Sequence, residues 1–315
     1  MARYVKVSTI GGNYRTIPKG TGKQEAVERM IEYWEGKLQQ VLPDNPDLIV
    51  LPEACDRYQN HTIEERIQYY KTRKDQVLEF FKDVAKKHNC YIAYSAAREV
   101  PDGSWRNSTQ IIDRSGEVIG IYNKNHVVIE ETTRGGILCG REAPVIKCDF
   151  GTVACAICFD LNFDEIRLKY IRQKPDMILF SSMYHGGLMQ AYWAYSCRAH
   201  FIGSVTALPC TIISPVGEIL ASSTNYFDFA THTINLDCRV IHLDYNREKL
   251  QLIKNKYGSR FKVSDPGYLA AVLISSETDE FTIDDIVDEF KLELLDNYME
   301  RSLAHRHNPK NMESI

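Results

Sequence analysis

The sequence predicts an α/β protein in which two sheets pack face to face between outer layers of helices. Three observations support this fold class. Short apolar runs alternate with longer amphipathic segments, the alternation occurs in both halves of the chain, and 315 residues are enough to bury a substantial core. We therefore expect two βαβ-rich halves, each contributing one sheet.

The first half alternates strands with two helical regions. Residues 47–51 (DLIVL) form an apolar run that Pro52 ends, and residues 90–96 (CYIAYSA) form another. The turn DRSG at 113–116 predicts a hairpin between its flanking strands. The predicted strands are 4–10, 47–51, 90–96, 108–112 and 117–122, and the predicted helical regions are 22–42 and 62–88.

The second half follows the same order. The apolar run MILFS at 177–181 predicts a buried strand, and the turn Pro-Val-Gly at 215–217 separates two further strands. The last two predicted strands are expected at or near a sheet edge. The predicted strands are 144–147, 151–157, 177–181, 201–208, 211–214, 217–222 and 231–236, and the predicted helices are 164–173 and 189–200.

The composition changes after about residue 267, which predicts a main domain over 1–266 and a C-terminal extension over 267–315. Residues 282–303 predict one long, acidic, amphipathic helix. Its apolar stripe could dock on the core of its own chain or cross to a second subunit, and both arrangements remain open. The stripe contains Ile283, Ile286, Phe290, Leu294 and Leu295.

The charge and cysteine content indicate the class of partner and the compartment. A net charge of −4 and an isoelectric point near 6.2 give no electrostatic reason to expect nucleic acid or a membrane surface, which favours a small-molecule substrate. No run of 18 apolar residues and no secretory signal are present. Nine cysteines, an odd number, then predict free thiols in a reducing cytoplasm.

Three residues with reactive side chains follow predicted strands. Glu53 comes directly after the strand 47–51, Lys124 after 117–122, and Cys158 after 151–157, at a strand-to-helix turn. Each has an ordinary structural explanation on its own: a helix-start carboxylate, a solvated lysine and an inert core thiol. Together they occupy strand ends, where ligands collect in α/β sheets, so we expect them to converge.

The position of Cys158 suggests nucleophilic chemistry. A thiol near a helix N-terminus is favoured as thiolate, and a nearby Lys124 ammonium would lower its pKa further. Glu53 would take the thiol proton and deliver it to a departing amine. Backbone amides at the turn could stabilise an oxyanion.

Cys155 and Cys158 also form a CxxC pair. Such a pair is found in redox centres and in metal sites, where it supplies half of the ligands. Cys155 is expected inside the strand 151–157, and alternation places it on the opposite face from Cys158. No second CxxC or close CxxH accompanies the pair. A buried structural role for Cys155 is therefore favoured.

The sequence resembles the nitrilase superfamily of carbon-nitrogen hydrolases over roughly residues 4–245. The resemblance rests on ordered motifs rather than on any single one. They are LPE at 51–53, YNKNH at 122–126, ICFDLNFDEIR at 157–167, DMILFSS at 176–182, the pair Arg198–Ala199 and SPVGEIL at 214–220.

This resemblance implies a four-layer αββα sandwich with two mixed sheets and a Glu53–Lys124–Cys158 triad. Cys158 would form a thioester with an amide substrate, and Lys124 and a backbone amide near Phe159 would hold the oxyanion. The resemblance requires no metal or organic cofactor, and it suggests a homodimer or larger homo-oligomer. Members often carry a second glutamate after the lysine; Glu131 is our choice and Glu130 the alternative.

The residues after Cys158 bear on which bond is cleaved. Phe159–Asp160 resembles the amidase and carbamoylase branches, whereas nitrile-specific members commonly have Trp-Glu there. Carbamoylases often place an arginine where this chain has Leu161–Asn162, although Arg134 or Arg167 could replace that clamp for a substrate carboxylate.

Tyr184 and His185 are expected to line the pocket, although His185 could instead hydrogen-bond locally. We thus expect an amidase-like hydrolase of non-peptide carbon–nitrogen bonds. Carbamoyl hydrolysis, nitrile hydrolysis, acyl transfer and a non-catalytic binding protein on the same fold are the alternatives.

Overall fold

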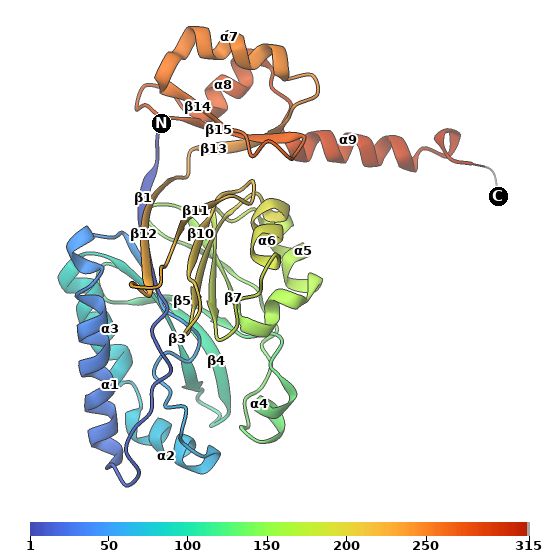
Figure 1. Cartoon of the computed structure of the whole chain (residues 1–315). Coiled ribbons are helices and arrows are strands. Elements are labelled where there is room, and N and C mark those ends of the chain that lie inside the picture. Colours follow the sequence, from blue (N-terminus) through green and yellow to red (C-terminus); the bar gives the residue numbers. More distant parts are fainter. Residues whose placement is uncertain (314–315) are drawn as a thin grey trace. The chain divides into compact units, whose positions relative to one another are not determined.

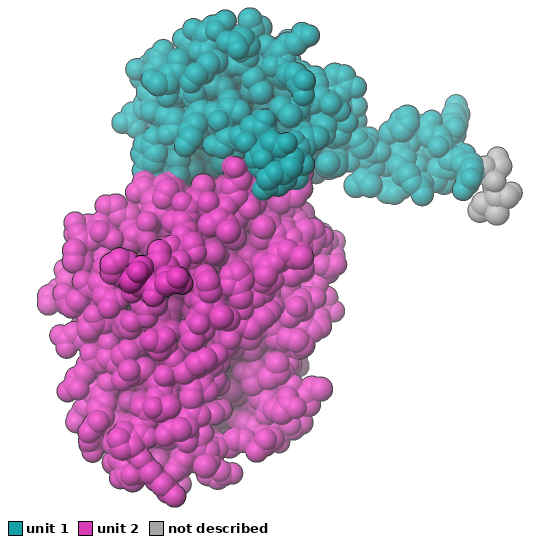
Figure 2. Space-filling model, in the orientation of Figure 1, with its two compact units in different colours: residues 1–4, 235–315 teal, residues 5–234 magenta. Residues whose placement is uncertain are grey.

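The computed structural model describes residues 1–313, which form two compact units (Figure 2). The larger unit comprises Val5–Ile234, and the smaller unit comprises residues 1–4 together with 235–313. No helix within the described residues is long and apolar enough to cross a membrane.

The first sheet of the larger unit has six strands in the order β12-β1-β2-β3-β4-β5. Strands β1, β2 and β3 are parallel, and β3, β4 and β5 are antiparallel, so the sheet is mixed. The strands are β1 (Tyr4–Ile10), β2 (Leu48–Val50), β3 (Tyr91–Glu99), β4 (Trp105–Ile112), β5 (Val118–Asn123) and β12 (Phe229–Asn235).

The second sheet has the corresponding order β11-β10-β9-β8-β7-β6. Strands β7, β8 and β9 are parallel, and antiparallel strands flank them on both sides. The strands are β6 (Val145–Lys147), β7 (Thr152–Ile157), β8 (Met177–Ser182), β9 (His200–Val205), β10 (Thr211–Ile213) and β11 (Ile219–Ser222). Every strand expected from the two halves is present, with its ends displaced by at most a few residues.

The two sheets pack face to face, and buried hydroxyl groups join them. Thr9 Oγ1 donates to the Gly203 carbonyl at 2.9 Å, Ser204 Oγ to the Ile10 carbonyl at 2.7 Å, and Ser181 Oγ to the Leu51 carbonyl at 2.8 Å. Each hydroxyl therefore satisfies its hydrogen bond on the opposite sheet, as a buried polar group must.

Helices cover the outer face of each sheet (Figure 1). The first sheet carries α1 (Lys23–Leu38) and α3 (Gln76–His88), and the second carries α5 (Asp164–Gln173) and α6 (Met189–Cys197). The predicted four-layer αββα sandwich is confirmed. Shorter helices complete the unit: α2 (Ile63–Arg73), α4 (Ile129–Thr133), η1 (Leu42–Asp44) and η2 (Cys158–Asn162).

The predicted helical region 62–88 is two helices. Thr62 and Glu65 form a reciprocal capping box that starts α2, because each side chain satisfies a backbone N–H of the other. Lys74 has a φ of 44°, which ends α2 before α3 begins at Gln76.

The smaller unit contains a three-stranded antiparallel sheet in the order β13-β15-β14. The expected boundary at 266/267 falls inside this sheet, between two paired strands, and residues 314–315 of the expected extension lie outside the described residues. Its elements are β13 (Cys238–His242), β14 (Phe261–Ser264), β15 (Ala271–Ser276), α7 (Arg247–Tyr257), η3 (Gly258–Arg260), α8 (Ile283–Phe290), α9 (Leu295–His307) and η4 (Pro309–Asn311).

The prediction of one continuous helix over 282–303 was wrong, because the chain breaks between α8 and α9. Lys291 takes a left-handed conformation with φ of 50°. Asn246 then binds the backbone of Glu293 on both sides, donating to its carbonyl at 2.9 Å and accepting from its N–H at 3.1 Å. Ile283 and Ile286 are buried in the core of the smaller unit itself. A tertiary contact has therefore overridden the local helical pattern.

Candidate active site

Strand direction brings the candidate residues to one edge of the first sheet. Strands β2 and β5 run the same way, so Glu53 and Lys124 follow their carboxyl ends at the same edge. Strand β4 runs in the opposite direction, so its beginning, with Asn107, lies at that edge too. The Lys124 N–H donates to the Asn107 carbonyl at 2.8 Å, which fixes the register there.

Lys124 lies between two carboxylates. Its Nζ is 2.8 Å from Glu53 Oε1 and 2.7 Å from Glu131 Oε2. Lys124 is only 2% exposed and Glu53 only 4%. Burial opposes the charge of the ammonium, but the two carboxylates outweigh it and raise the pKa of Lys124. The lysine is thus a fixed cation.

Asn107 joins the two carboxylates and was not predicted from the sequence. Its Nδ2 donates to Glu53 Oε1 at 2.8 Å and to Glu131 Oε1 at 3.1 Å. The sequence analysis searched only residues that follow strands, whereas Asn107 lies near the start of one. Its place at the start of a strand that runs opposite to its neighbours is the sequence feature from which Asn107 could have been predicted.

The second glutamate beside Lys124 is Glu131 rather than Glu130. Glu131 lies in the first turn of α4, where its Oε2 also accepts the Val128 N–H at 3.0 Å. Burial acts to raise the pKa of Glu131, but the charge and hydrogen bond of Lys124 lower it below its usual value. Glu130 is exposed and has no contact with the lysine.

Cys158 lies at a strained turn directly after β7. Its φ of 49° is left-handed, which costs a non-glycine residue roughly 1–2 kcal/mol. Ala54, directly after Glu53, has the same unusual conformation with φ of 47°. Such strain concentrates at functional sites, because the surrounding structure must hold it in place.

The surroundings of Cys158 favour its neutral thiol form. Burial raises its pKa, and the charge and hydrogen bond of Glu53 raise it further, to about 12. Lys124 and the Met183 backbone act in the opposite direction but are outweighed. The surroundings of Cys158 therefore do not lower this pKa as the sequence analysis expected. Lys124 is neutralised by Glu53 and Glu131, and the helix after Cys158 is a short 3₁₀ turn.

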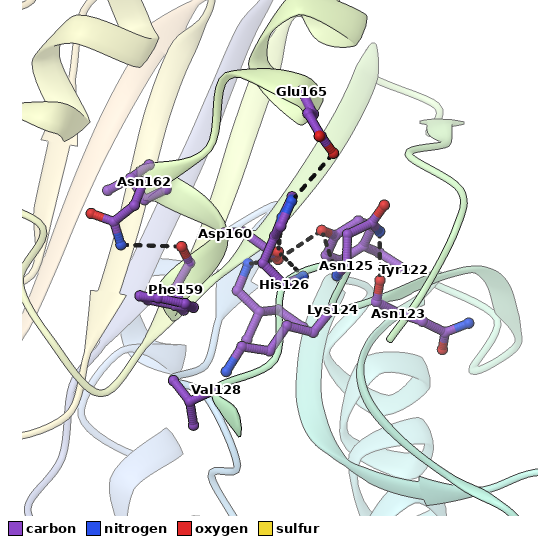
Figure 3. A network of polar contacts seen from close by, with 12 residues as sticks. Tyr122, Asn123, Lys124, Asn125, His126, Val128, Phe159, Asp160, Asn162 and Glu165 are labelled. Atoms are coloured by element: carbon purple, nitrogen blue, oxygen red, sulfur yellow. Dashed lines mark hydrogen bonds and ion pairs between the residues drawn. The ribbon is translucent and has the colours of Figure 1, made fainter. Parts of the chain in front are cut away.

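A buried carboxylate, Asp160, holds the turn that carries Cys158 (Figure 3). Its Oδ2 accepts from the Tyr122 hydroxyl at 2.7 Å and from the Ile157 N–H at 3.0 Å, while its Oδ1 accepts from the His126 N–H at 2.7 Å. The His126 ring stacks on Phe163 with centroids 3.9 Å apart. The turn after β7 is thereby tied to the segment that carries Lys124.

The three residues expected to line the pocket differ in their placement. Tyr184 is partly buried, burial is the chief cause that raises its pKa to about 12, and its hydroxyl accepts from Asn162 Nδ2 at 3.0 Å. Phe159 is 37% exposed, and its carbonyl accepts from the Asn162 side chain at 3.1 Å. His185 hydrogen-bonds locally, its Nδ1 accepting the Gly187 N–H at 3.2 Å.

A cavity of about 640 Å³ adjoins this cluster and is lined by both Asn107 and Glu131. Ala54, next to Glu53, lines it as well.

Within residues 1–313 no group of three or more histidine, cysteine or acidic side chains is placed to hold a metal ion. Cys155 is fully buried in β7, which raises its pKa above the usual range.

Residues 6–237 match the sequence family described as carbon-nitrogen hydrolase, a span that covers both sheets and every residue of the cluster. The chain belongs to this family. It is 24% identical over 260 residues to a deaminated glutathione amidase of Dictyostelium discoideum, covering 72% of this chain and 88% of that protein.

Solved structures share the fold at low sequence identity. Saccharomyces cerevisiae Nit3, a member of branch 10 of the nitrilase superfamily, has a TM-score of 0.60 and 16% identity, covering 82% of this chain and 97% of that one. An amidase from Nesterenkonia sp. AN1, with acrylamide added at its active-site cysteine, has a TM-score of 0.61 and 13% identity. The match covers 79% of this chain and 98% of the amidase. The protein is thus an enzyme of the nitrilase superfamily that acts on carbon–nitrogen bonds, as the sequence motifs predicted.

Proposed function

We propose that the enzyme hydrolyses amides through a thioester on Cys158. One observation supports this most strongly: Lys124 Nζ lies 2.8 Å from Glu53 and 2.7 Å from Glu131, and both Lys124 and Glu53 act on the buried Cys158 thiol. A neutral thiol needs a base at the moment of attack, and Glu53 is the base in contact with it.

In the first half-reaction, Cys158 Sγ attacks the amide carbonyl while Glu53 accepts the thiol proton. Lys124 has three N–H donors, of which Glu53 and Glu131 occupy two. The third is available for the oxyanion, together with backbone N–H groups of the turn at Phe159. Collapse of the tetrahedral adduct breaks the carbon–nitrogen bond, and Glu53 returns the proton to the departing ammonia or amine.

In the second half-reaction, Glu53 takes a proton from water as the water oxygen attacks the thioester carbonyl. The carbon–sulfur bond breaks, the acid leaves, and the proton returns to the Cys158 sulfur. Attack by an amine instead of water would give acyl transfer by the same geometry. The enzyme's own side chains supply every proton that moves.

An amide is favoured over a nitrile because Phe159–Asp160 follow the nucleophile, and Asp160 is fixed by its buried contacts. The relatives described as amidases agree with that preference. Carbamoyl compounds remain the second candidate, since their carbonyl carbon would react with Cys158 in the same way.

Ammonia release from a panel of amides, carbamoyl compounds and nitriles tests this proposal. We expect amides to be the fastest class and Cys158→Ala to abolish release while the fold is retained. Cys139→Ala is the matched control, because Cys139 is an exposed cysteine whose side chain is not part of the triad. Full activity of Cys158→Ala would refute the mechanism, and faster turnover of nitriles would reverse the choice of bond.

A further inference from the structure

A second, smaller cavity lies at the sheet edge that carries the reacting groups. Its volume is about 20 Å³, and Glu53 forms part of its wall. It can hold at least one water molecule, which needs about 10–15 Å³. Further lining residues directly follow the carboxyl ends of two strands from each sheet, namely Gly11 after β1, Pro52 near the end of β2, Met183 after β8 and Thr206 after β9.

Two residues of this wall act on the Cys158 thiol. Burial and the Glu53 carboxylate raise the pKa of the thiol, and a hydrogen bond with the Met183 backbone opposes them. Both Glu53 and Met183 line the small cavity. The cavity is therefore bounded by the general base of the proposed mechanism and by a direct neighbour of the nucleophile.

The small cavity is distinct from the larger one described above. The larger cavity, of about 640 Å³, is lined by Asn107 and Glu131. Ala54 and Arg57 line both cavities and thus form a wall between them. An acyl group that stays in the larger cavity after the amine has left would not fill the smaller one. Water held in the small cavity would remain next to Glu53 during the first half-reaction.

Three residues that line the small cavity each carry a buried polar atom that makes no hydrogen bond within residues 1–313. These atoms are the hydroxyl oxygen of Tyr33 and the Nε atoms of Arg15 and Arg57. Buried polar atoms are nearly always satisfied, either by protein groups or by ordered water. A buried water typically makes about three hydrogen bonds. Two N–H donors, a hydroxyl and the Glu53 carboxylate could supply them.

The Tyr33 hydroxyl is held in place by its surroundings. The guanidinium carbon of Arg15 lies 3.8 Å from the centre of the Tyr33 ring. A Cβ atom on Gly12 would come within 2.6 Å of the hydroxyl, so glycine allows this close approach to the backbone after β1. Burial raises the pKa of Tyr33 to about 12. The hydroxyl therefore stays protonated and can both donate and accept a hydrogen bond.

We propose that the small cavity holds the water that hydrolyses the Cys158 thioester, and that the Tyr33 hydroxyl positions this water beside Glu53. The inference rests on the proposed thioester mechanism and adds the place from which its water comes. The water oxygen bonds to the acyl carbon as its proton passes to Glu53, the carbon–sulfur bond breaks, and the proton returns to the sulfur. Tyr33 is a positioning residue, because it acts through the water and exchanges no proton of its own.

The rates of the two half-reactions in Tyr33→Phe test the inference. The variant removes one hydrogen bond to the water and leaves the larger cavity unchanged. Ammonia release in the first turnover should keep its wild-type rate. Decay of the Cys158 thioester, followed by acid quenching after excess substrate is removed, should slow about tenfold. An equal loss in both half-reactions would mean that Tyr33 is only structural and would overturn the inference.

Tyr91→Phe is the matched control. Tyr91 is a buried tyrosine at the start of β3, the opposite end of that strand from the site, and its hydroxyl accepts from the Asp149 N–H at 3.1 Å. The change removes a comparable hydroxyl away from the small cavity, so both rates should stay at their wild-type values. Equally slow thioester decay in the two variants would contradict a specific role for Tyr33.

A crystal structure separates this inference from the proposed function. We expect a water within hydrogen-bond distance of the Tyr33 hydroxyl and the Glu53 carboxylate in the wild type, and its loss or displacement in Tyr33→Phe. If no amide is hydrolysed but this difference is seen, amide hydrolysis fails and the water site stands. If the Cys158 thioester forms and decays at the same rate in both proteins, the role of the water site alone is refuted.

Discussion

At the residue scale, the protonation of Cys158 depends on the charges around it. Lys124 is next to the thiol, yet its charge is balanced by Glu53 and Glu131, both within 2.8 Å of its Nζ. The sequence showed a lysine and a cysteine at neighbouring strand ends. It could not show that Glu53 and Glu131 would pair with Lys124 and balance its charge, because those contacts depend on three-dimensional geometry.

The pH dependence of alkylation measures this directly. A pKa of about 12 keeps the thiol protonated, so its reaction with iodoacetamide should rise with pH without a plateau up to about pH 10. Glu53→Gln removes a charge that raises the pKa, so its profile should shift to lower pH. Mass spectrometry of the Cys158 peptide gives the rate, and exposed Cys139 is the internal control. A wild-type plateau near pH 7 would contradict the protonated state.

Asn107 is expected to position the two carboxylates rather than to react. Asn107→Ala removes its hydrogen bonds to Glu53 and Glu131, so kcat should fall about 10- to 100-fold with little loss of folded protein. The pH profile of kcat should shift as well, because Asn107 donates to the general base. Asn255→Ala, at an exposed site on α7, is the control. Unchanged kcat and pH profile would exclude a positioning role.

At the element scale, the turn after β7 depends on Asp160. Its carboxylate is fully buried and accepts hydrogen bonds from Tyr122, His126 and the Ile157 backbone. The sequence identified Asp160 only as a marker of the amidase branches. Its structural role was hidden because two of its partners, Tyr122 and His126, lie more than 30 residues away in the sequence.

Asp160→Ala should lower the free energy of unfolding by about 3 kcal/mol or more, since it leaves several buried donors unpaired. Urea denaturation followed by circular dichroism gives this value. Glu25→Ala removes an exposed ion pair with Arg29 and should cost less than about 1 kcal/mol. Similar losses in the two variants would show that the buried network is unimportant for stability.

Local pattern predicted the elements of the larger unit well and the C-terminal helices poorly. The strands of the two sheets follow apolar runs such as DLIVL and MILFS, whose burial on both faces leaves little choice of structure. The break between α8 and α9 depends on Asn246, 47 residues before Glu293. A helical pattern cannot reveal a contact of that kind.

At the scale of the whole molecule, self-association remains a prediction from the family resemblance. We expect a homodimer or larger homo-oligomer, and multi-angle light scattering should give at least twice the chain mass of 36.2 kDa. The measurement should be repeated across protein concentrations, because association is governed by mass action. A mass equal to one chain at every concentration would contradict the prediction.

The central claim is that Cys158 carries the acyl group during turnover, and acid quenching of the enzyme during steady-state amide hydrolysis tests it most directly. We predict an added mass equal to the acyl part of the substrate, mapped by peptide analysis to Cys158 and absent from Cys158→Ala. Ammonia release with the acyl group on another residue, or with none on Cys158 under conditions where the thioester is stable, would contradict the claim.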